Sequence, residues 1–217
     1  EEEKEEIELL QENVKVILEN EGTVSPAWIA VLGAYRPLNS FSWANALLKT
    51  EWPDEIKKVI VRQVDNVREE QALHSKIPRL TSIDDKVSQL VRNQYEENPY
   101  PRWVNPGLSD QPKTISQALQ SYKLHLNFDV QQFSNKPDIL VAGCGTGAHA
   151  LSTASIFKNC TVLAIDLSLN SLSYAKRKTQ ELGIKNIEYM QGDILKLDQL
   201  EREFDIIESV GVLHHMD

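Results

Sequence analysis

Three glycines and one aspartate are the residues of this sequence best placed to do chemistry. Gly143, Gly145 and Gly147 stand in the turn that follows a short apolar run, and Asp166 ends the next apolar run. Glycine accepts positive φ angles and lets a ligand approach the backbone, and a carboxylate can accept hydrogen bonds from both hydroxyls of a ribose. Strand, glycine turn, helix, strand and acid in this order are typical of a nucleoside site in a parallel α/β sheet. The alternative is a tight strand-to-helix turn followed by a solvated acid.

Alternating apolar runs and helical patterns must position these residues. The expected strands are 139–142, 162–165, 187–190 and 204–208, and the expected helices are 148–157 and 169–182. This alternation predicts a doubly wound, Rossmann-like parallel sheet with right-handed crossovers. Because such a sheet usually has more strands, we expect the segment to be a C-terminally truncated domain.

The N-terminal region, residues 1–97, is expected to be an all-α helical domain. Its apolar residues recur at helical spacing, and the expected helices are 7–18, 27–35, 40–48, 54–66 and 83–97, the last one capped by Ser82. Helix pairs joined by short turns suggest a helical repeat, although no clean period can be aligned.

Residues 98–136 are expected to connect the two regions. Three prolines and a glycine in 98–107 forbid a continuous helix. Tyr100 and Trp103 in the same stretch predict an ordered loop that packs on the second domain rather than an exposed linker. The segment 114–124 is expected to form a helix that covers the sheet.

Bulk composition excludes several classes of protein. The chain has 217 residues and a net charge of −9, with no dense Lys/Arg run, which argues against a nucleic-acid partner. No apolar stretch approaches the length of a membrane span. Cys144 and Cys160 are too few for a disulfide framework, so a cytoplasmic setting is expected. His214 and His215 are adjacent, an arrangement that rarely serves one metal ion, so no metal site is expected.

Four linked motifs resemble those of the class I S-adenosylmethionine-dependent methyltransferases. They are G-C-G-T-G at 143–147, A-I-D at 164–166, Q-G-D at 191–193 and F-D-I-I-E-S-V-G-V-L-H-H-M at 204–216. The resemblance covers 137–217, which is identified as an S-adenosylmethionine-binding domain. In addition, Q-Y-E-E-N-P-Y-P-R-W at 94–103 resembles a segment of bacterial proteins in which a tetratricopeptide-type helical region precedes such a domain.

The resemblance implies S-adenosylmethionine as the cofactor and a set of residues that contact it. These residues are Gly143, Cys144, Gly145, Gly147, Asp166, Leu167, Asp193, Ile194, Glu208 and Arg102. The three glycines would bring the backbone against the methionine portion, and Asp166 would bind the ribose hydroxyls. Asp193 would accept a hydrogen bond from the adenine amino group, and Ile194 would pack on the ring.

One position departs from the family pattern. Val141 stands where many members have an acid, so the anchor for the cofactor's ammonium is either missing or supplied by another residue such as Glu208. Arg102 either binds the methionine carboxylate bidentately or pairs with a neighbouring glutamate. His214 is either a general base or a loop or core histidine, and no other catalytic residue is predicted.

Two other functions stay open. Gly143, Gly145 and Ala148 satisfy G-x-G-x-x-A, which is typical of NAD(P)-dependent oxidoreductases, but a dinucleotide leaves Gly192 and Asp193 unexplained. The chain could also be a non-catalytic binding module. The favoured function is methyl transfer to a small molecule or a protein, with no nucleic-acid or membrane partner.

Overall fold

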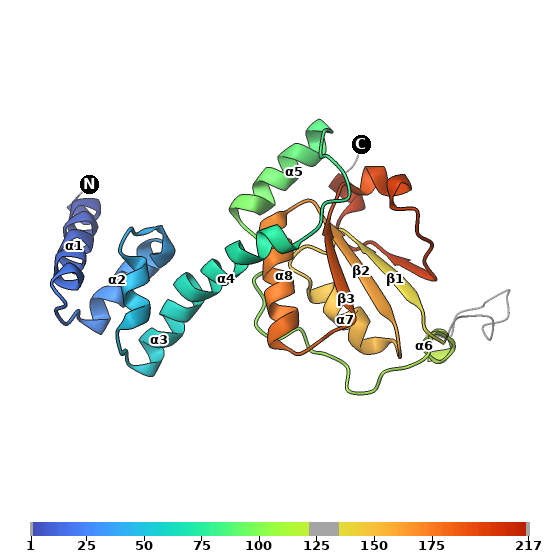
Figure 1. Ribbon diagram of the computed structural model, residues 1–217, viewed down its shortest axis with the longest axis horizontal. Helices are drawn as coiled ribbons and strands as arrows, with labels where there is room; N and C mark the ends of the chain where they lie inside the picture. Colours follow the sequence, from blue (N-terminus) through green and yellow to red (C-terminus); the bar gives the residue numbers. More distant parts are fainter. Residues whose placement is uncertain (1, 122–134, 216–217) are drawn as a thin grey trace. The chain divides into compact units, whose positions relative to one another are not determined.

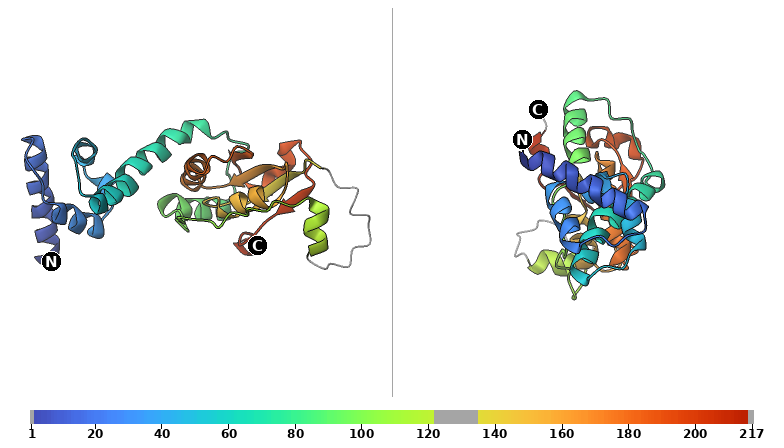
Figure 2. Two further views of the ribbon diagram at one scale, coloured as in Figure 1. Left: turned by 90° about the horizontal axis from the view of Figure 1, so that it is seen from below. Right: turned by 90° about the vertical axis from the view of Figure 1, so that its left-hand side faces the viewer.

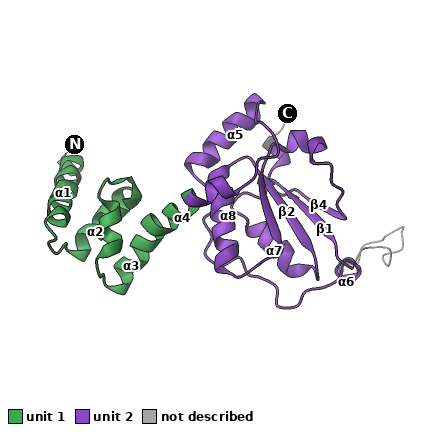
Figure 3. Ribbon diagram, viewed as in Figure 1, with its two compact units in different colours: residues 1–71 green, residues 72–217 purple. Residues whose placement is uncertain are grey.

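The computed structural model describes residues 2–121 and 135–215, in two compact units (Figure 3). The units are Glu1–Gln71 and Ala72–Asp217. The helix at 86–97, which periodicity alone grouped with the N-terminal helices, therefore belongs to the C-terminal unit. None of the described helices combines the length and the apolar character that a membrane span requires.

The N-terminal unit is helical, as predicted. Its elements are α1 (Glu2–Glu19), α2 (Pro26–Tyr35), the 3₁₀ turns η1 (Leu38–Ser40) and η2 (Ala44–Lys49), α3 (Asp54–Ile60), the π-helical turn η3 (Val61–Asp65) and most of α4 (Asn66–Leu73). The core of this unit is formed by the apolar face of α1, including the fully buried Val14, and by Ile29, Leu32 and Leu47.

The helix expected at 40–48 is wrong, because this stretch forms two short 3₁₀ turns instead of one α-helix. Phe41 and Trp43 are both buried and their rings stack with centroids 4.7 Å apart. Residues two positions apart do not share a face of an α-helix, so burying both rings together requires the chain to leave helical geometry here.

The C-terminal unit is a four-stranded parallel sheet with helices packed along it (Figures 1 and 2). Its strands are β1 (Asp138–Ala142), β2 (Thr161–Asp166), β3 (Ile187–Gln191) and β4 (Ile206–Glu208), in the order β3-β2-β1-β4. The helical elements are η4 (His74–Lys76), α5 (Lys86–Glu97), α6 (Ile115–Ser121), α7 (Ala148–Ile156), α8 (Leu169–Glu181), η6 (Ile194–Leu200) and η7 (Leu213–His215). This architecture confirms the predicted Rossmann-like fold class. Residues 122–124 of the helix expected at 114–124 lie outside the described residues.

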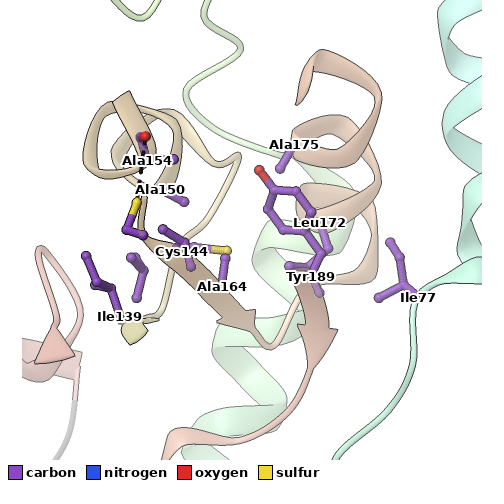
Figure 4. Close-up of a cluster of buried hydrophobic side chains, with 12 residues drawn as sticks. Ile77, Ile139, Cys144, Ala150, Ala154, Ala164, Leu172, Ala175 and Tyr189 are labelled. Carbon is purple, nitrogen blue, oxygen red and sulfur yellow. Dashed lines mark hydrogen bonds between the residues drawn. The ribbon is translucent and has the colours of Figure 1, made fainter. Parts of the chain in front are cut away.

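The central strands are buried on both faces, as parallel strands usually are. Ile139 and Val141 of β1 face α7 and α8, whereas Leu140 and Ala142 face a second cluster that includes Ile194. Figure 4 shows the first cluster, with Tyr189 of β3 lying against α8. The sheet is therefore packed firmly enough to hold the ends of its strands in fixed positions.

Helix α5 begins three residues later than expected. The side chain of Asp85 accepts a hydrogen bond from the Ser88 N–H at 2.9 Å and caps the helix. Ser82, the predicted cap, instead donates its hydroxyl to Asp84 at 2.6 Å. Asp and Ser are both good N-cap residues, so the sequence offers two starting points and the tertiary structure uses the second.

Candidate active site

A cavity of about 520 Å³ opens at the carboxyl ends of the strands in the C-terminal unit. Of the residues expected to contact a cofactor, its wall includes Gly143, Cys144, Gly145, Asp166, Leu167, Asp193 and Ile194. Gly147, Glu208, Arg102 and His214 are not among the lining residues. The fold thus brings the loops after β1, β2 and β3 to one concave surface, which is where ligands bind in open α/β sheets.

The glycine turn after β1 is tied directly to the strand beside it. The Gly145 N–H donates to Oδ2 of Asp166 at 2.7 Å, and the Gly143 N–H donates to the Ile165 carbonyl at 2.8 Å. Gly145 has a φ of 52°, and a Cβ added there would meet nothing within 4 Å. This position therefore leaves open space for a ligand next to the backbone.

Gly143 and Gly147 are required for packing. A Cβ on Gly143 would lie 2.3 Å from Cγ2 of Val212, and a Cβ on Gly147 would lie 2.5 Å from the Cβ of Ala175. Gly147 has a φ of 83° and precedes the first residue of α7. Its missing side chain lets α7 and α8 approach closely, and this role differs from the cofactor contact that the resemblance implies.

Asp166 is positioned by the backbone. Besides the bond from Gly145, its Oδ1 accepts a hydrogen bond from the Ser168 N–H at 2.9 Å. Burial raises the pKa of this carboxyl above its ordinary value, and the hydrogen bonds from Ser168 and Gly145 oppose that shift. A carboxylate offers about four lone-pair sites, so each oxygen can still accept a further hydrogen bond from a ligand in the cavity.

Asp193 carries an unused acceptor. It is 1% exposed, and its Oδ1 accepts a hydrogen bond from the Leu195 N–H at 3.0 Å. Its Oδ2 is buried and has no hydrogen-bond partner within the described part of the chain. A buried acceptor without a partner is costly, and Asp193 lines the cavity, so a ligand with an N–H donor would satisfy it.

Glu208 lies beside Val141, the position where many members of the resembled family have an acid. It pairs in register with Val141 on the adjacent strand. Its Oε2 accepts the Thr153 hydroxyl at 2.6 Å and lies 3.0 Å from Nε2 of His149. The hydrogen bond with Glu208 raises the pKa of His149. Burial acts to raise the pKa of Glu208, but the contacts with His149 and Thr153 outweigh it, so the pKa of Glu208 is lowered. Glu208 is therefore committed to its neighbours, and His149 is the member of the pair that lines the cavity.

Helix α5 supplies a wall that the sequence motifs did not indicate. Val87, Val91 and Tyr95 all line the cavity, and each lies four residues from the next. That spacing places them on one face of the helix. The sequence shows the amphipathic pattern of this helix, but no sequence motif indicates that its apolar face packs at the ends of strands that begin only at Asp138.

Arg102 and His214 lie away from the cavity wall. The guanidinium carbon of Arg102 lies 5.1 Å from the centroid of the Tyr174 ring, which is the geometry of a cation–π contact. His214 is exposed in the turn η7. Among the residues that the structure describes, no group of three His, Cys, Asp or Glu side chains could hold a metal ion.

The charge of the cavity wall is one-sided. Its lining residues include Asp85, Asp166 and Asp193, together with His149, but neither lysine nor arginine in the described ranges. Such a wall attracts cationic ligands and repels anionic ones.

The comparisons with known proteins concern methyltransferases. Residues 139–217 match the family model described as a methyltransferase domain. This segment is methyltransferase-like. The chain is similar to an uncharacterized protein of Synechococcus sp., with 31% identity over 146 residues that cover 66% of this chain and 34% of the relative. It is also similar to (S)-coclaurine N-methyltransferase of Papaver somniferum, with 32% identity over 108 residues that cover 50% of this chain and 30% of the relative.

A solved structure of magnesium protoporphyrin IX methyltransferase from Synechocystis with bound SAM has 22% identity and a TM-score of 0.40, covering 63% of this chain and 67% of that chain. The chain spans about a third of the length of the two curated relatives. The methyltransferase-like segment contains all four strands and both helices, α7 and α8, that surround the glycine turn.

Proposed function

We propose that this chain binds S-adenosylmethionine in the cavity at the carboxyl ends of its strands and transfers the methyl group to an acceptor. The observation that carries the proposal is the cavity wall, which contains three aspartates and neither lysine nor arginine among the described residues. S-adenosylmethionine offers such a wall a nucleoside and a positively charged sulfonium.

The adenosyl half of the cofactor fits the two strand-end acids. Asp166 keeps lone pairs for the ribose hydroxyls, and Oδ2 of Asp193 is a buried acceptor that the adenine amino group would satisfy. Ile194 and Leu167, which flank these acids, supply apolar contact. Gly145 leaves space for the methionine portion next to the backbone.

The charge of the wall also argues against a dinucleotide. A pyrophosphate carries negative charge and is normally bound by a helix N-terminus with room around it. Here it would face three carboxylates without a lysine or arginine from the described wall. The favoured ligand is therefore a cationic nucleoside.

The part played by the protein is positioning and the exclusion of water. The bound cofactor supplies an activated methyl group, and holding it in line with an acceptor lowers the barrier by an entropic effect. Helix α5 contributes Val87 and Val91 as an apolar cover. Glu208 pairs in register with Val141, but its carboxylate is bound by His149 and Thr153, so its role as an anchor for the cofactor's ammonium stays a prediction.

Several narrower expectations stay predictions. The methyl acceptor stays predicted as either a small molecule or a protein. The tetratricopeptide-type character of the helical region and the cytoplasmic location rest on the sequence. The binding of a carboxylate by Arg102 and the action of His214 as a base also stay predictions.

Calorimetric titration of the chain with S-adenosylhomocysteine and, in parallel, with NADH tests the proposal. We expect saturable binding of S-adenosylhomocysteine and none of NADH at the same concentrations. Tighter binding of S-adenosylmethionine than of its neutral product would support the role of the charged wall. Binding of NADH alone, or of neither ligand, would overturn the proposal.

A further inference from the structure

The segment 95–103, here called the strap, joins the two loops that hold the cofactor-binding residues. We propose that the strap fixes the glycine turn and the loop carrying Asp166 relative to each other, and that Glu96 is the positioning residue at one end of it. This inference rests on the proposed function, because it assigns the strap to the same site.

The first end of the strap holds the loop after β2. The two carboxylate oxygens of Glu96 accept hydrogen bonds from the Leu169 N–H at 2.7 Å and the Asn170 N–H at 3.1 Å. The Glu96 carbonyl accepts a third bond from Nδ2 of Asn170 at 2.7 Å, and the Tyr95 carbonyl accepts the Ser168 hydroxyl at 3.1 Å. Four hydrogen bonds therefore fix the chain directly after Asp166.

The second end of the strap holds the glycine turn. The Thr146 hydroxyl donates to the Pro101 carbonyl at 2.7 Å, and the indole N–H of Trp103 donates to the Thr146 carbonyl at 2.9 Å. The Trp103 carbonyl accepts the Tyr174 hydroxyl, and the two rings meet edge to face with centroids 5.7 Å apart. Thr146 is 2% exposed, so these bonds are shielded from water.

The contacts form two separate links between the glycine turn and the loop after β2. On one side, Asp166 links the two loops directly through its bond from the Gly145 N–H. On the other side, the strap links them through Glu96 and Pro101. Tyr95, Tyr100 and Pro101 themselves line the cavity, so the strap is both a wall of the site and a brace for the two loops that it contacts.

The bonds of Glu96 go beyond an ordinary helix cap. Helix α8 already has a local cap, because the Ser168 hydroxyl accepts the Ser171 N–H at 3.0 Å. Glu96 satisfies two further N–H groups from 73 and 74 positions away in the sequence. Its charge also suits the positive end of the helix. This second, distant cap therefore fixes the position of the loop that follows Asp166.

A double-mutant cycle between Glu96→Gln and Asp166→Asn tests the inference, with the affinity of the full chain for S-adenosylhomocysteine as the readout. Glu97→Gln is the matched control, because Glu97 is the exposed neighbour and makes none of these contacts. We expect about 10-fold weaker binding for Glu96→Gln and about 100-fold for Asp166→Asn, since hydrogen bonds to charged groups contribute about 1.5–3 kcal/mol. If Glu96 acts through Asp166, the double variant binds no worse than about 100-fold, because the effects are not additive.

Two results would overturn the inference. One is a double variant whose loss equals the product of the single losses, which would mean that Glu96 affects the fold but not Asp166. The other is a Glu96→Gln variant that binds as tightly as Glu97→Gln. Thermal melting checks that each variant is folded, and Thr146→Val at the second end of the strap replaces Glu96→Gln in the cycle if that variant is not.

Failure of the proposed function would be visible separately, since the parent chain itself would then not bind S-adenosylhomocysteine. In that case hydrogen exchange at the amides of 168–171 decides the inference. Faster exchange in Glu96→Gln than in Glu97→Gln supports the brace, and equal exchange overturns it.

Discussion

Acidic side chains stand at both ends of the sheet, but among the described residues only those at the amino end are paired with an arginine. At the amino end, Arg202 contacts Oδ1 of Asp138 at 3.1 Å and Oε2 of Glu188 at 3.2 Å. At the carboxyl end, Asp166 and Asp193 have no ion pair with any lysine or arginine that the structure describes, and they rely on backbone N–H groups. The first group stabilises the fold, whereas the second group is available to a ligand.

The difference shows that residue type alone does not mark a functional acid. Asp138 and Asp166 both lie at an end of neighbouring strands, and both are partly exposed. What separates them is the direction of the strand, which places one beside Arg202 and the other beside the cavity. Substitutions at the two ends should therefore affect different quantities.

The largest effect is expected from glycines within the carboxyl end itself. Gly147→Ala should lower the free energy of unfolding by about 3 kcal/mol, because positive φ costs about 1–2 kcal/mol for alanine and overpacking against Ala175 adds about 1–3 kcal/mol. Gly145→Ala meets no neighbour and should cost only the backbone strain, while weakening S-adenosylhomocysteine binding. Urea denaturation and calorimetry measure the two quantities, and equal stability losses would contradict the assignment.

The second largest effect is expected from a comparison of one acid at the carboxyl end of the sheet with one at the amino end. Asp193→Asn should weaken S-adenosylhomocysteine binding by about 10- to 100-fold, because an unsatisfied buried donor or acceptor costs about 1–3 kcal/mol. The same substitution should leave the melting temperature unchanged or raise it, since it replaces a buried carboxyl group whose Oδ2 has no hydrogen-bond partner among the described residues. Asp138→Asn is the matched control and should lower stability slightly without changing affinity. Loss of binding in both variants would show that the two ends are not distinct.

The smallest effect concerns pH. The raised pKa of His149 means that its pairing with Glu208 stabilises the fold fully below its ordinary pKa of 6.5, and that this contribution is lost as pH rises through the raised value. The lowered pKa of Glu208 means that its contribution is present above 4.5 and lost as pH falls below that. His149→Gln should therefore cost most stability between these limits, by less than about 1 kcal/mol because the pair is partly exposed to solvent.

Denaturation of the parent and the His149→Gln variant at several pH values measures this difference. A difference that grows above neutral pH would contradict the ion pair.

The sequence by itself determined the sheet and the part of the site that is local to it. Strand, glycine turn and acid between 138 and 166 form one βαβ unit, in which the two apolar runs and the glycines of the turn are visible in the residues. Asp193 could be placed in the same way, because parallel strands end at the same edge.

Only the tertiary structure decided which residues surround that unit. The strap, the wall formed by α5 and the contact between Gly147 and Ala175 join residues far apart in the chain. The placement of Arg102 over Tyr174 and the pairing of His149 with Glu208 are of the same kind. Such contacts depend on how helices and strands pack against each other, and the local periodicity of the sequence does not predict that packing.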